Sequence, residues 1–364
     1  MTNLTIAHQR LNNQKLSHTK FTSPQEIVKW LGAVQSQDYQ AAKWAVGLRS
    51  KNLNDAALEE SFTSGAILRT HILRPTWHFV LPEDIRWMLT LTAPHVRAAL
   101  AYYDRSLKVD AATLRRSHDA IGKALQGGKQ LTRDEISAAL RKAGIVSDGQ
   151  RLGHLVMHAE LDGLICSGAR RGKQFTYALL DERAPLARTL ERDEALMELV
   201  KRYFTSRGPA TLKDFAWWSG LSMAEVQRGL EMVKSGFEHK AVDEQVYWYS
   251  ASASGKKDAS PSAYLLPNYD EYVVGYTDRS AIYDESQNHK LDARGNFLFQ
   301  NTIVIDSQVI GTWKRTLKKN EIILELSPFE KLTKIQKQAM DHAANRYGAF
   351  PGLPATIITF GEKD

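Results

Sequence analysis

The order of helix-like and strand-like stretches is the feature that most limits how this chain can fold. In the first third, three stretches with apolar side chains at helical spacing precede two strand-like runs, and these five stretches are residues 24–34, 44–48, 54–62, 67–73 and 76–81. Pro24 suits the first turn of the first helix, and Asn54 suits the N-cap of the third. Three helices followed by a hairpin, here turning at Arg74 and Pro75, is the order of a winged helix, a variant of the helix-turn-helix.

The same order recurs twice further along the chain, although no sequence identity between the copies is detectable. In the second copy, Thr132 and Glu135 have capping-box spacing before a helix, a second helix covers residues 151–164, and strands cover 164–168 and 175–179. The third copy would use helices at 194–204, 211–219 and 222–233 and strands at 237–242 and 245–249. Three copies of one supersecondary unit predict a tandem array, with modules at residues 1–105, 106–188 and 189–250.

The chain changes character after residue 250. Residues 251–263 are small, polar and turn-rich, so we expect a linker there. Beyond it, strand-like stretches at 264–277, 297–310, 322–326 and 356–360 accompany one helix at 331–347. Residues 264–364 therefore predict a small, mostly antiparallel β-domain that forms a partly open barrel. The predicted fold class is α+β, with tandem winged-helix modules followed by this β-domain.

Length and composition describe a folded chain without membrane segments. The 364 residues exceed what one hydrophobic core usually serves, which favours roughly two to four domains or modules. No apolar run reaches the roughly 20 residues of a membrane-spanning helix, no signal peptide is visible, and a single cysteine, Cys166, excludes an intramolecular disulfide. We therefore expect a cytoplasmic protein. The net charge of +7 leans only modestly towards a nucleic-acid partner.

The common enzyme signatures are absent from the sequence. It has no phosphate-binding glycine loop, no GxSxG elbow and no HExxH or CxxC metal pattern. His154 and His158 stand one helical turn apart, but no third ligand is in register, so two polar residues on a packed helix are the more common explanation. Cys166 lies in an apolar stretch and is expected to be a core residue rather than a nucleophile. We therefore predict no metal and no cofactor.

Two clusters of basic residues are candidates for DNA contact. The first crowds the predicted tip of the second hairpin, where a winged helix reaches the phosphate backbone, and consists of Arg170, Arg171 and Lys173. The second lies at a predicted turn between residues 310 and 322 and consists of Lys314, Arg315, Lys318 and Lys319. Such residues would supply salt-dependent affinity without sequence preference. The alternative for both clusters is a solvated, solubilising loop.

Three stretches of the sequence resemble one known family. Residues 31–49 read LGAVQSQDYQAAKWAVGLR, residues 73–78 read LRPTWH, and residues 266–279 read LPNYDEYVVGYTDR. All three are similar to the AlkZ-like (YcaQ-type) winged-helix DNA glycosylases, and the resemblance follows nearly the whole chain in order. It implies tandem winged helices with a C-terminal β-domain, and excision of alkylated bases. Characterised members of that family unhook interstrand crosslinks joined through N7 of guanine.

The catalytic motif of that family is glutamine, an aliphatic residue, then glutamine or aspartate. Gln35 and Gln37 occupy the two polar positions, so the resemblance implies that they are catalytic, whereas Ser36 departs from the aliphatic position. Asp38 is a supporting acceptor in this prediction, ranked below the glutamines because it falls outside the matched spacing. The alternative for the stretch is a polar turn between helices.

Glutamine limits the chemistry that such a site can carry out. Its amide does not ionise near neutral pH, but it can orient a water molecule and place a carbonyl dipole near a sugar with oxocarbenium character. Such a site suffices only for a good leaving group, and an N7-alkylated guanine is positively charged and departs neutral. Together with the family resemblance, these residues therefore predict a monofunctional DNA glycosylase that acts on alkylated purines of the N7-alkylguanine type.

The hairpin of the first module is expected to lie beside the catalytic loop. We therefore predict that the DNA cleft is lined by Arg74, Thr76 and His78. Four charged residues in the third matching stretch are explained at least as well by an internal salt-bridged turn as by DNA contact, namely Asp270, Glu271, Asp278 and Arg279.

The implied partner is double-stranded DNA carrying alkylated bases or crosslinks. We expect a monomer that acts in the cytoplasm, associated with the bacterial nucleoid. The alternative function is a winged-helix DNA-binding protein without catalysis, such as a transcription regulator. The pair Gln35 and Gln37 favours the glycosylase, and no dimerisation helix or effector pocket is evident in the sequence.

Overall fold

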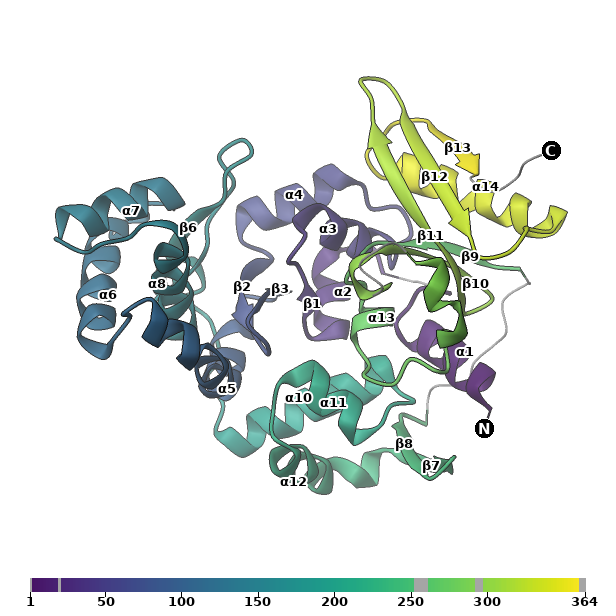
Figure 1. Cartoon of the computed structure of the whole chain (residues 1–364). Coiled ribbons are helices and arrows are strands. Elements are labelled where there is room, and N and C mark those ends of the chain that lie inside the picture. The colour runs from purple at the N-terminus through teal and green to yellow at the C-terminus, as the bar shows by residue number, and fades with distance from the viewer. Residues whose placement is uncertain (1, 19–20, 252–260, 292–296, 360–364) are drawn as a thin grey trace.

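The computed structural model describes residues 2–18, 21–251, 261–291 and 297–359 (Figure 1). Most of the predicted linker, residues 251–263, lies outside the described residues. Up to residue 249, the elements form three successive groups, and each group contains three helices followed by a hairpin. The predicted tandem order is therefore confirmed, whereas the module boundaries stay predictions.

In the first group, a three-stranded sheet accompanies the helices. Its elements are α2 (Pro24–Leu31), β1 (Val34–Gln35), α3 (Tyr39–Gly47), α4 (Asp55–Ser64), β2 (Leu68–Ile72) and β3 (Thr76–Val80), preceded by α1 (Asn3–Asn13). The strand order is β1-β3-β2, and both pairings are antiparallel. Asn54 caps α4, as predicted, because its side chain accepts a hydrogen bond from the Ala57 N–H at 2.9 Å.

The second group repeats this arrangement after the long helix α5 (Ile85–Ser106), which the sequence analysis did not predict. Its elements are α6 (Ala111–Leu125), β4 (Leu131–Thr132), α7 (Arg133–Lys142), α8 (Gly149–Leu161), β5 (Ile165–Ser167), β6 (Thr176–Leu179) and the short α9 (Leu180–Arg183). The strand order is β4-β6-β5, which matches the first sheet. Thr132 and Glu135 form the predicted capping box of α7.

The third group has the same helices but a smaller sheet. Its elements are α10 (Arg192–Arg207), α11 (Leu212–Ser219), α12 (Met223–Val233), the 3-10 turn Lys234–Gly236, β7 (Glu238–Val242) and β8 (Gln245–Tyr249). A single bridge between Ala210 and Trp248 stands where the other groups have a short first strand. No helix in the described part of the chain is long and apolar enough to cross a membrane.

The C-terminal part is a five-stranded sheet with one long helix. Its elements are β9 (Ala263–Leu266), α13 (Glu271–Val274), the 3-10 turns Glu285–Lys290 and Phe297–Phe299, β10 (Asn301–Ile305), β11 (Gln308–Leu317), β12 (Ile322–Pro328), α14 (Lys334–Ala349) and β13 (Ala355–Thr359). The strand order is β13-β12-β11-β10-β9, and only β12 and β13 pair in parallel. The mostly antiparallel α+β class is confirmed.

Two details of the C-terminal prediction are wrong. The predicted partly open barrel stays a prediction, because the strand order shows only that β9 and β13 are the two edges of the sheet in the described residues. The strand predicted at 264–277 ends at Leu266, since Pro267 has no N–H to donate and Asp270 caps α13. Lys314 and Arg315 lie within β11 rather than in a turn, because that strand continues to Leu317.

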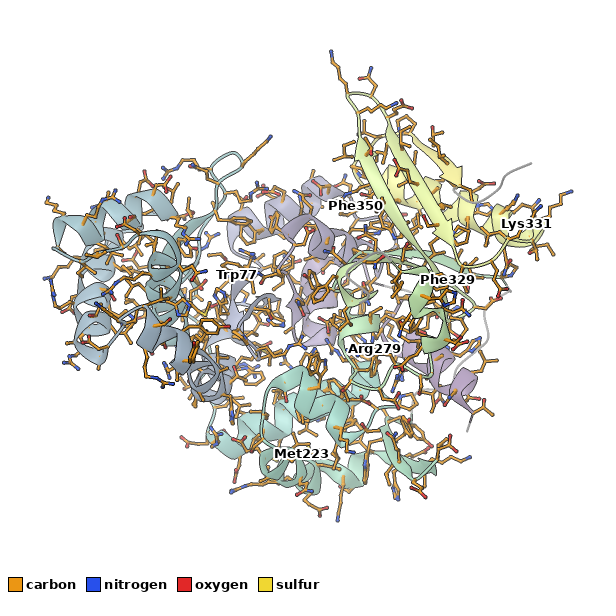
Figure 2. The ribbon with its side chains drawn as sticks, in the orientation of Figure 1. Trp77, Met223, Arg279, Phe329, Lys331 and Phe350 are labelled. Carbon is orange, nitrogen blue, oxygen red and sulfur yellow. The ribbon has the colours of Figure 1, made fainter. Side chains whose placement is uncertain are left out.

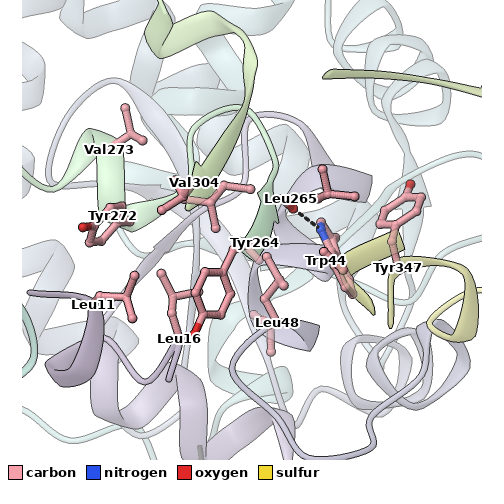
Figure 3. Packing of buried hydrophobic residues seen from close by; sticks show 14 of the residues in the cluster. Leu11, Leu16, Trp44, Leu48, Tyr264, Leu265, Tyr272, Val273, Val304 and Tyr347 are labelled. Carbon is pink, nitrogen blue, oxygen red and sulfur yellow. Dashed lines mark hydrogen bonds between the residues drawn. The ribbon is translucent and has the colours of Figure 1, made fainter. Parts of the chain in front are cut away.

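One hydrophobic core joins the N-terminal helices to the C-terminal sheet. Trp44 of α3 packs edge-on against Tyr347 of α14, with ring centroids 5.0 Å apart, and its indole N–H donates to the carbonyl of Leu265 at 2.7 Å (Figure 3). The core includes Ile27 and Val28 from the start of the chain and Ile322 and Leu324 from its end. Segments some 300 residues apart in the sequence therefore fold as one body.

The sheet β1-β3-β2 lies between two hydrophobic cores. Leu68, Ile72 and Val80 pack with α5, α10, α11 and α12, whereas Val34 and Phe79 belong to the core shared with the C-terminal sheet. The second group has its own core, which includes Ile121, Leu140, Leu155 and Ile165. Because both faces of the first sheet are covered, its polar side chains must find partners inside the molecule.

Candidate active site

The predicted catalytic loop connects β1 to α3 at the centre of the molecule (Figure 1). Gln35 is the last residue of β1, and Asp38 is the N-cap of α3, where its carboxylate accepts from the Ala41 N–H at 3.0 Å. Between them, the Ser36 N–H donates to the carbonyl of Trp77 at 2.7 Å, and Arg69 donates to the carbonyl of Ser36 at 3.1 Å. The loop is therefore fixed at both ends and in the middle.

Gln35 is buried and held through both its backbone and its side chain. Its N–H donates to the Glu271 carboxylate at 2.9 Å, and its Oε1 accepts from Arg74 Nη2, also at 2.9 Å. A guanidinium group only donates, so Oε1 and not the amide nitrogen must face Arg74. The NH2 group of Gln35 therefore points away from Arg74.

Gln37 is the exposed member of the pair. Its Oε1 accepts from the Trp77 N–H at 3.3 Å, so one lone pair of the carbonyl oxygen is used and the other remains for a ligand. It lines a cavity of about 380 Å³ whose other walls come from the first hairpin and from the second group, namely Arg69, Trp77, Thr132, Arg133, Asp134, Lys173, Gln174, Phe175 and Tyr177. Trp77 is labelled in Figure 2, between these two parts of the chain.

Asp38 faces a separate cavity of about 180 Å³ that the C-terminal sheet helps to form. Lys314 and Arg315 of β11 also line this cavity. Basic residues that the sequence analysis placed at a hairpin tip and at a distant turn thus lie on the two sides of the loop, Lys173 beside Gln37 and Lys314 beside Asp38. Their contact with DNA stays a prediction.

The three residues predicted to line a DNA cleft differ in exposure. Arg74 is partly buried, and its guanidinium carbon lies 5.2 Å from the ring centroid of Trp217 on α11. Thr76 is partly buried, and His78 is 0% exposed, so it presents no surface to DNA in this structure. Burial, followed by the positive charge of Arg74, holds the pKa of His78 well below its ordinary value. His78 is therefore neutral.

The basic residues of the second hairpin also differ from one another. Arg170 is mostly buried, with its Nη1 at 3.4 Å from Glu59 Oε2 and its guanidinium over the rings of Tyr39 and Phe175. Arg171 pairs with Glu135 at 2.8 Å on the surface, and Lys173 is exposed. Only the last two residues of the predicted cluster are therefore accessible to a phosphate backbone.

Tyr39 connects this hairpin to the catalytic loop. Its ring, one residue after Asp38, packs edge-on against Phe175 with centroids 5.1 Å apart, and its hydroxyl donates to Glu59 at 3.2 Å. Arg170 covers the same tyrosine ring at 5.0 Å. The base of the second hairpin thus buttresses the loop that carries both glutamines.

The structure adds support residues that the sequence analysis did not place at the loop. Glu271 is fully buried, and its Oε2 accepts from Arg207 at 2.6 Å and from the Trp218 indole at 2.9 Å while Oε1 accepts from Gln35. Arg207 also donates to the carbonyls of Leu31 and Ala33. The internal ion pair considered for Glu271 is present. In the sequence, the only indication of this supporting role of Glu271 is that a charged residue lies within an apolar stretch.

Trp217 is a second residue that the sequence analysis missed. It is 44% exposed, which is unusual for so large a ring, and its indole N–H donates to the carbonyl of Val274 at 3.2 Å. Arg74 and Arg279 lie 5.2 and 5.9 Å from its ring centroid (Arg279 is labelled in Figure 2). This exposed aromatic side chain lies next to the residue that binds Gln35.

The histidine pair and the cysteine have internal surroundings. His154 and His158 both bond to the carboxylate of Asp104, at 2.8 and 2.9 Å. Across the described ranges, no group of three or more histidine, cysteine, aspartate or glutamate side chains could hold a metal ion. Cys166 is buried, and burial raises the pKa of its thiol to about 12, so it is not a thiolate at neutral pH.

Comparisons with known proteins identify the family and the fold of the chain. A family model described as "DNA glycosylase AlkZ-like" matches residues 28–350. An interstrand DNA cross-link repair glycosylase from Streptomyces sahachiroi is 23% identical over 96% of this chain and 97% of its own. The solved structure of Streptomyces sahachiroi DNA glycosylase AlkZ superposes with a TM-score of 0.78, at 19% identity, over 98% of this chain and 100% of that one.

Proposed function

Because the chain belongs to the AlkZ-like DNA glycosylase family, and so is an enzyme that hydrolyses N-glycosidic bonds in DNA, we propose that its substrates are alkylated purines of the N7-alkylguanine type. The observation that carries this proposal is the fixed loop with Gln35 and Gln37, which places a neutral carboxamide at an accessible cavity. The alternative function, a regulator that binds DNA without catalysis, is not favoured, because the members of this family are glycosylases.

Gln37 is the residue that we assign to the nucleophilic water. The free lone pair of its Oε1 can accept a hydrogen bond from water, and the Trp77 N–H holds the carbonyl in place. Neither glutamine can remove a proton as a strong base would. The leaving base must therefore already be activated, as a cationic N7-alkylpurine is, because it departs as a neutral molecule.

The cavity beside Gln37 has the properties expected of a site for a purine or its neighbouring nucleotide. Trp77, Phe175 and Tyr177 provide flat apolar faces, on which bases stack without sequence preference. Lys173 and Arg133 at the same cavity carry positive charge for the phosphates. Residues 106–188 hold 14 lysines and arginines against 9 aspartates and glutamates, an excess of five in a chain whose net charge is +7.

We extend the proposal to interstrand crosslinks joined through N7 of guanine. The Streptomyces sahachiroi relative is an interstrand DNA cross-link repair glycosylase, and it aligns over nearly all of both chains. Each end of such a crosslink is an N7-alkylated, cationic guanine. Its excision therefore requires the same chemistry at Gln37 as the excision of a single adduct.

The decisive experiment is incubation with a duplex that carries one N7-methylguanine, with abasic sites scored by strand cleavage in alkali. We expect cleavage at the modified position only, and no cleavage with a Gln35→Ala, Gln37→Ala double variant. A second duplex with a nitrogen-mustard crosslink through guanine N7 tests unhooking. Cleavage of neither duplex by the wild-type protein would reject the proposed substrate class.

A further inference from the structure

One buried arginine at the cavity beside Gln37 has no carboxylate partner. Among the described residues, four arginines are buried. Three of them form ion pairs with buried carboxylates, namely Arg10 with Asp214 at 3.5 Å, Arg49 with Asp270 at 2.8 Å and Arg207 with Glu271 at 2.6 Å. The fourth, Arg69 of β2, is 7% exposed and forms no ion pair within the described part of the chain. Burial lowers the pKa of Arg69 to about 10, so its guanidinium is still charged at neutral pH. A buried charge without a counter-charge is costly, so stability alone does not explain this arginine.

Arg69 is held in place by contacts that leave most of its donors unused. Its Nε donates to the carbonyl of Ser36, within the catalytic loop, at 3.1 Å, and its backbone N–H donates to Ser167 Oγ at 2.8 Å. Its guanidinium carbon lies 4.3 Å from the ring centroid of Trp77 and 4.6 Å from that of Phe175. Two aromatic rings thus hold the charge by cation–π contact, which uses none of the N–H groups in a conventional hydrogen bond.

The unused donors are the two Nη groups of Arg69. Neither has a hydrogen-bond partner among the residues that the structure describes, and neither is fully enclosed, so both reach accessible surface. Arg69 lines the cavity of about 380 Å³ together with Gln37. Asp134, the carboxylate among the residues that line this cavity, is exposed and forms no ion pair with Arg69. The Nη groups are therefore available to an acceptor on a bound ligand.

The surroundings of these donors suit a base better than a phosphate. Phosphates lie on the outside of a duplex, where they can be met by exposed cations of this cavity such as Arg133 and Lys173. Arg69 is buried and lies against two aromatic rings, and bases stack on such rings. On the major-groove edge of guanine the acceptors are N7 and O6, so alkylation of N7 leaves O6 as the acceptor on that edge.

We propose that Arg69 is a further catalytic residue, whose Nη groups donate to O6 of the N7-alkylguanine as this base leaves. When the C1′–N9 bond breaks, its electron pair passes to the base, which departs neutral, while water forms the new C1′–O bond and releases its proton to the solvent. O6 becomes a better acceptor as the base loses its positive charge, and the repulsion between the base and the guanidinium decreases. Both changes favour the transition state over the bound substrate. The proposal rests on the proposed function, because that function supplies the O6 acceptor.

The group at position 6 of the leaving base tests this contact. N7-methyl-2,6-diaminopurine has a 6-amino donor where N7-methylguanine has O6, so Arg69 cannot donate to it there. Arg69→Met keeps an unbranched stem against the two rings but has no donor. We measure single-turnover rates for both bases, each divided by the rate of spontaneous depurination, and expect the ratio of guanine to diaminopurine to fall about tenfold or more in Arg69→Met. If Arg69 only supports Ser36, both rates should fall equally, and this unchanged ratio would overturn the proposal.

Arg133→Met is the matched control, because Arg133 lines the same cavity and is exposed. We expect it to reduce the slope of log DNA affinity against log salt by about one unit, without changing the ratio between the two leaving bases. Arg69→Met should leave the slope unchanged. A reduced slope in Arg69→Met would assign a phosphate to Arg69 and reject its contact with the base.

A binding measurement without turnover separates failure of this proposal from failure of the proposed function. The free bases 7-methylhypoxanthine and 7-methyladenine carry an oxygen and an amino group at position 6, and each is titrated into the wild-type protein bound to a duplex with a tetrahydrofuran abasic site. By saturation-transfer NMR, we expect tighter binding of 7-methylhypoxanthine, and loss of this preference in Arg69→Met. No preference in the wild-type protein would reject the role of Arg69. The expected preference without excision of either N7-methylpurine would retain the contact and reject only the proposed substrate class.

Discussion

The first hairpin, β2–β3, and the second, β5–β6, occupy the same position in two successive groups of elements, but their surroundings differ. Every residue of β2 is buried, and the first hairpin bonds to both glutamines, through Arg74 to Gln35 and through the Trp77 N–H to Gln37. The second hairpin is buried only at its base, and its tip is exposed from Arg171 to Gln174.

What surrounds each hairpin decides what it can do. The first lies between two hydrophobic cores, so its polar side chains are used to hold other residues in place. None of the described residues covers the tip of the second, so its charges remain accessible to a polyanion. Substitutions in the first hairpin and its loop should therefore change the rate of excision, and substitutions at the tip of the second should change DNA affinity.

The largest effect is expected at the loop that the first hairpin holds. Gln37→Ala should lower single-turnover excision by about a hundredfold or more, because it removes the group assigned to the water. Gln35→Ala should also impair excision, by a smaller factor. Both should leave DNA affinity within a few-fold of the wild type, since a positioned water matters to the transition state and not to ground-state binding.

Rate measurements at saturating enzyme, together with fluorescence anisotropy on the same duplex, separate the two quantities. Undiminished excision by the double variant would remove the catalytic assignment. A parallel loss of affinity would show that the loop binds DNA, which would erase the difference between the two hairpins.

A smaller effect is expected at the tip of the second hairpin. Arg170, Arg171 and Lys173 changed together to alanine should weaken binding to any duplex and reduce the slope of log affinity against log salt by about two units. The reduction is two and not three because the Arg170 side chain is mostly buried, whereas Arg171 and Lys173 are exposed. The double variant Arg171→Ala, Lys173→Ala should therefore give the same slope as the triple variant, in titrations at several salt concentrations. An unchanged slope would show that this tip points away from DNA.

Local features of the fold were predictable from the sequence because their causes are local. The capping box of Thr132 and Glu135 and the cap at Asn54 mark helix starts that the structure contains. The union of the C-terminal sheet with the first helices was not predictable. It depends on contacts such as that of Trp44 with Leu265, which are 221 residues apart and leave no periodic signal.

The candidate site shows the same division. Gln35 and Gln37 are two residues apart, so their proximity follows from the chain itself, but their unequal burial does not. Polar and apolar side chains do not alternate at Trp77, His78 and Phe79, because β3 packs against other elements on both sides. The sequence of this strand therefore does not indicate which side chains are buried. The burial of His78 and the support from Glu271 therefore had to come from the structure.

The ion pair at the base of the second hairpin should have a small effect, and one on stability rather than on affinity. Arg170→Met should lower the free energy of unfolding by about 0.5 kcal/mol, because its 3.4 Å pair with Glu59 is partly exposed and screened. The salt slope of DNA binding should not change. Urea unfolding and the same salt titrations measure the two quantities. If Arg170→Met reduced the slope of log affinity against log salt by one unit, Arg170 would contact DNA with the tip residues instead of supporting the catalytic loop.

The last prediction is an expected absence of effect, and it tests whether the loop held by the first hairpin acts through water or through an amine. A lyase-type enzyme would form a Schiff base between a lysine and the sugar, which borohydride reduces to a covalent adduct. Gln35 to Tyr39 contains no lysine, and the nearby Lys43 is buried with its ammonium 2.8 Å from Asp55 and 2.9 Å from Glu59. Both carboxylates hold the buried amine group of Lys43 in ion pairs, so it is not available to attack a sugar. We therefore expect no protein–DNA adduct on electrophoresis after borohydride treatment during turnover, and product strands that break only after alkali or heat. An adduct that maps to Lys43 would replace the water-positioning role of the glutamines by covalent catalysis.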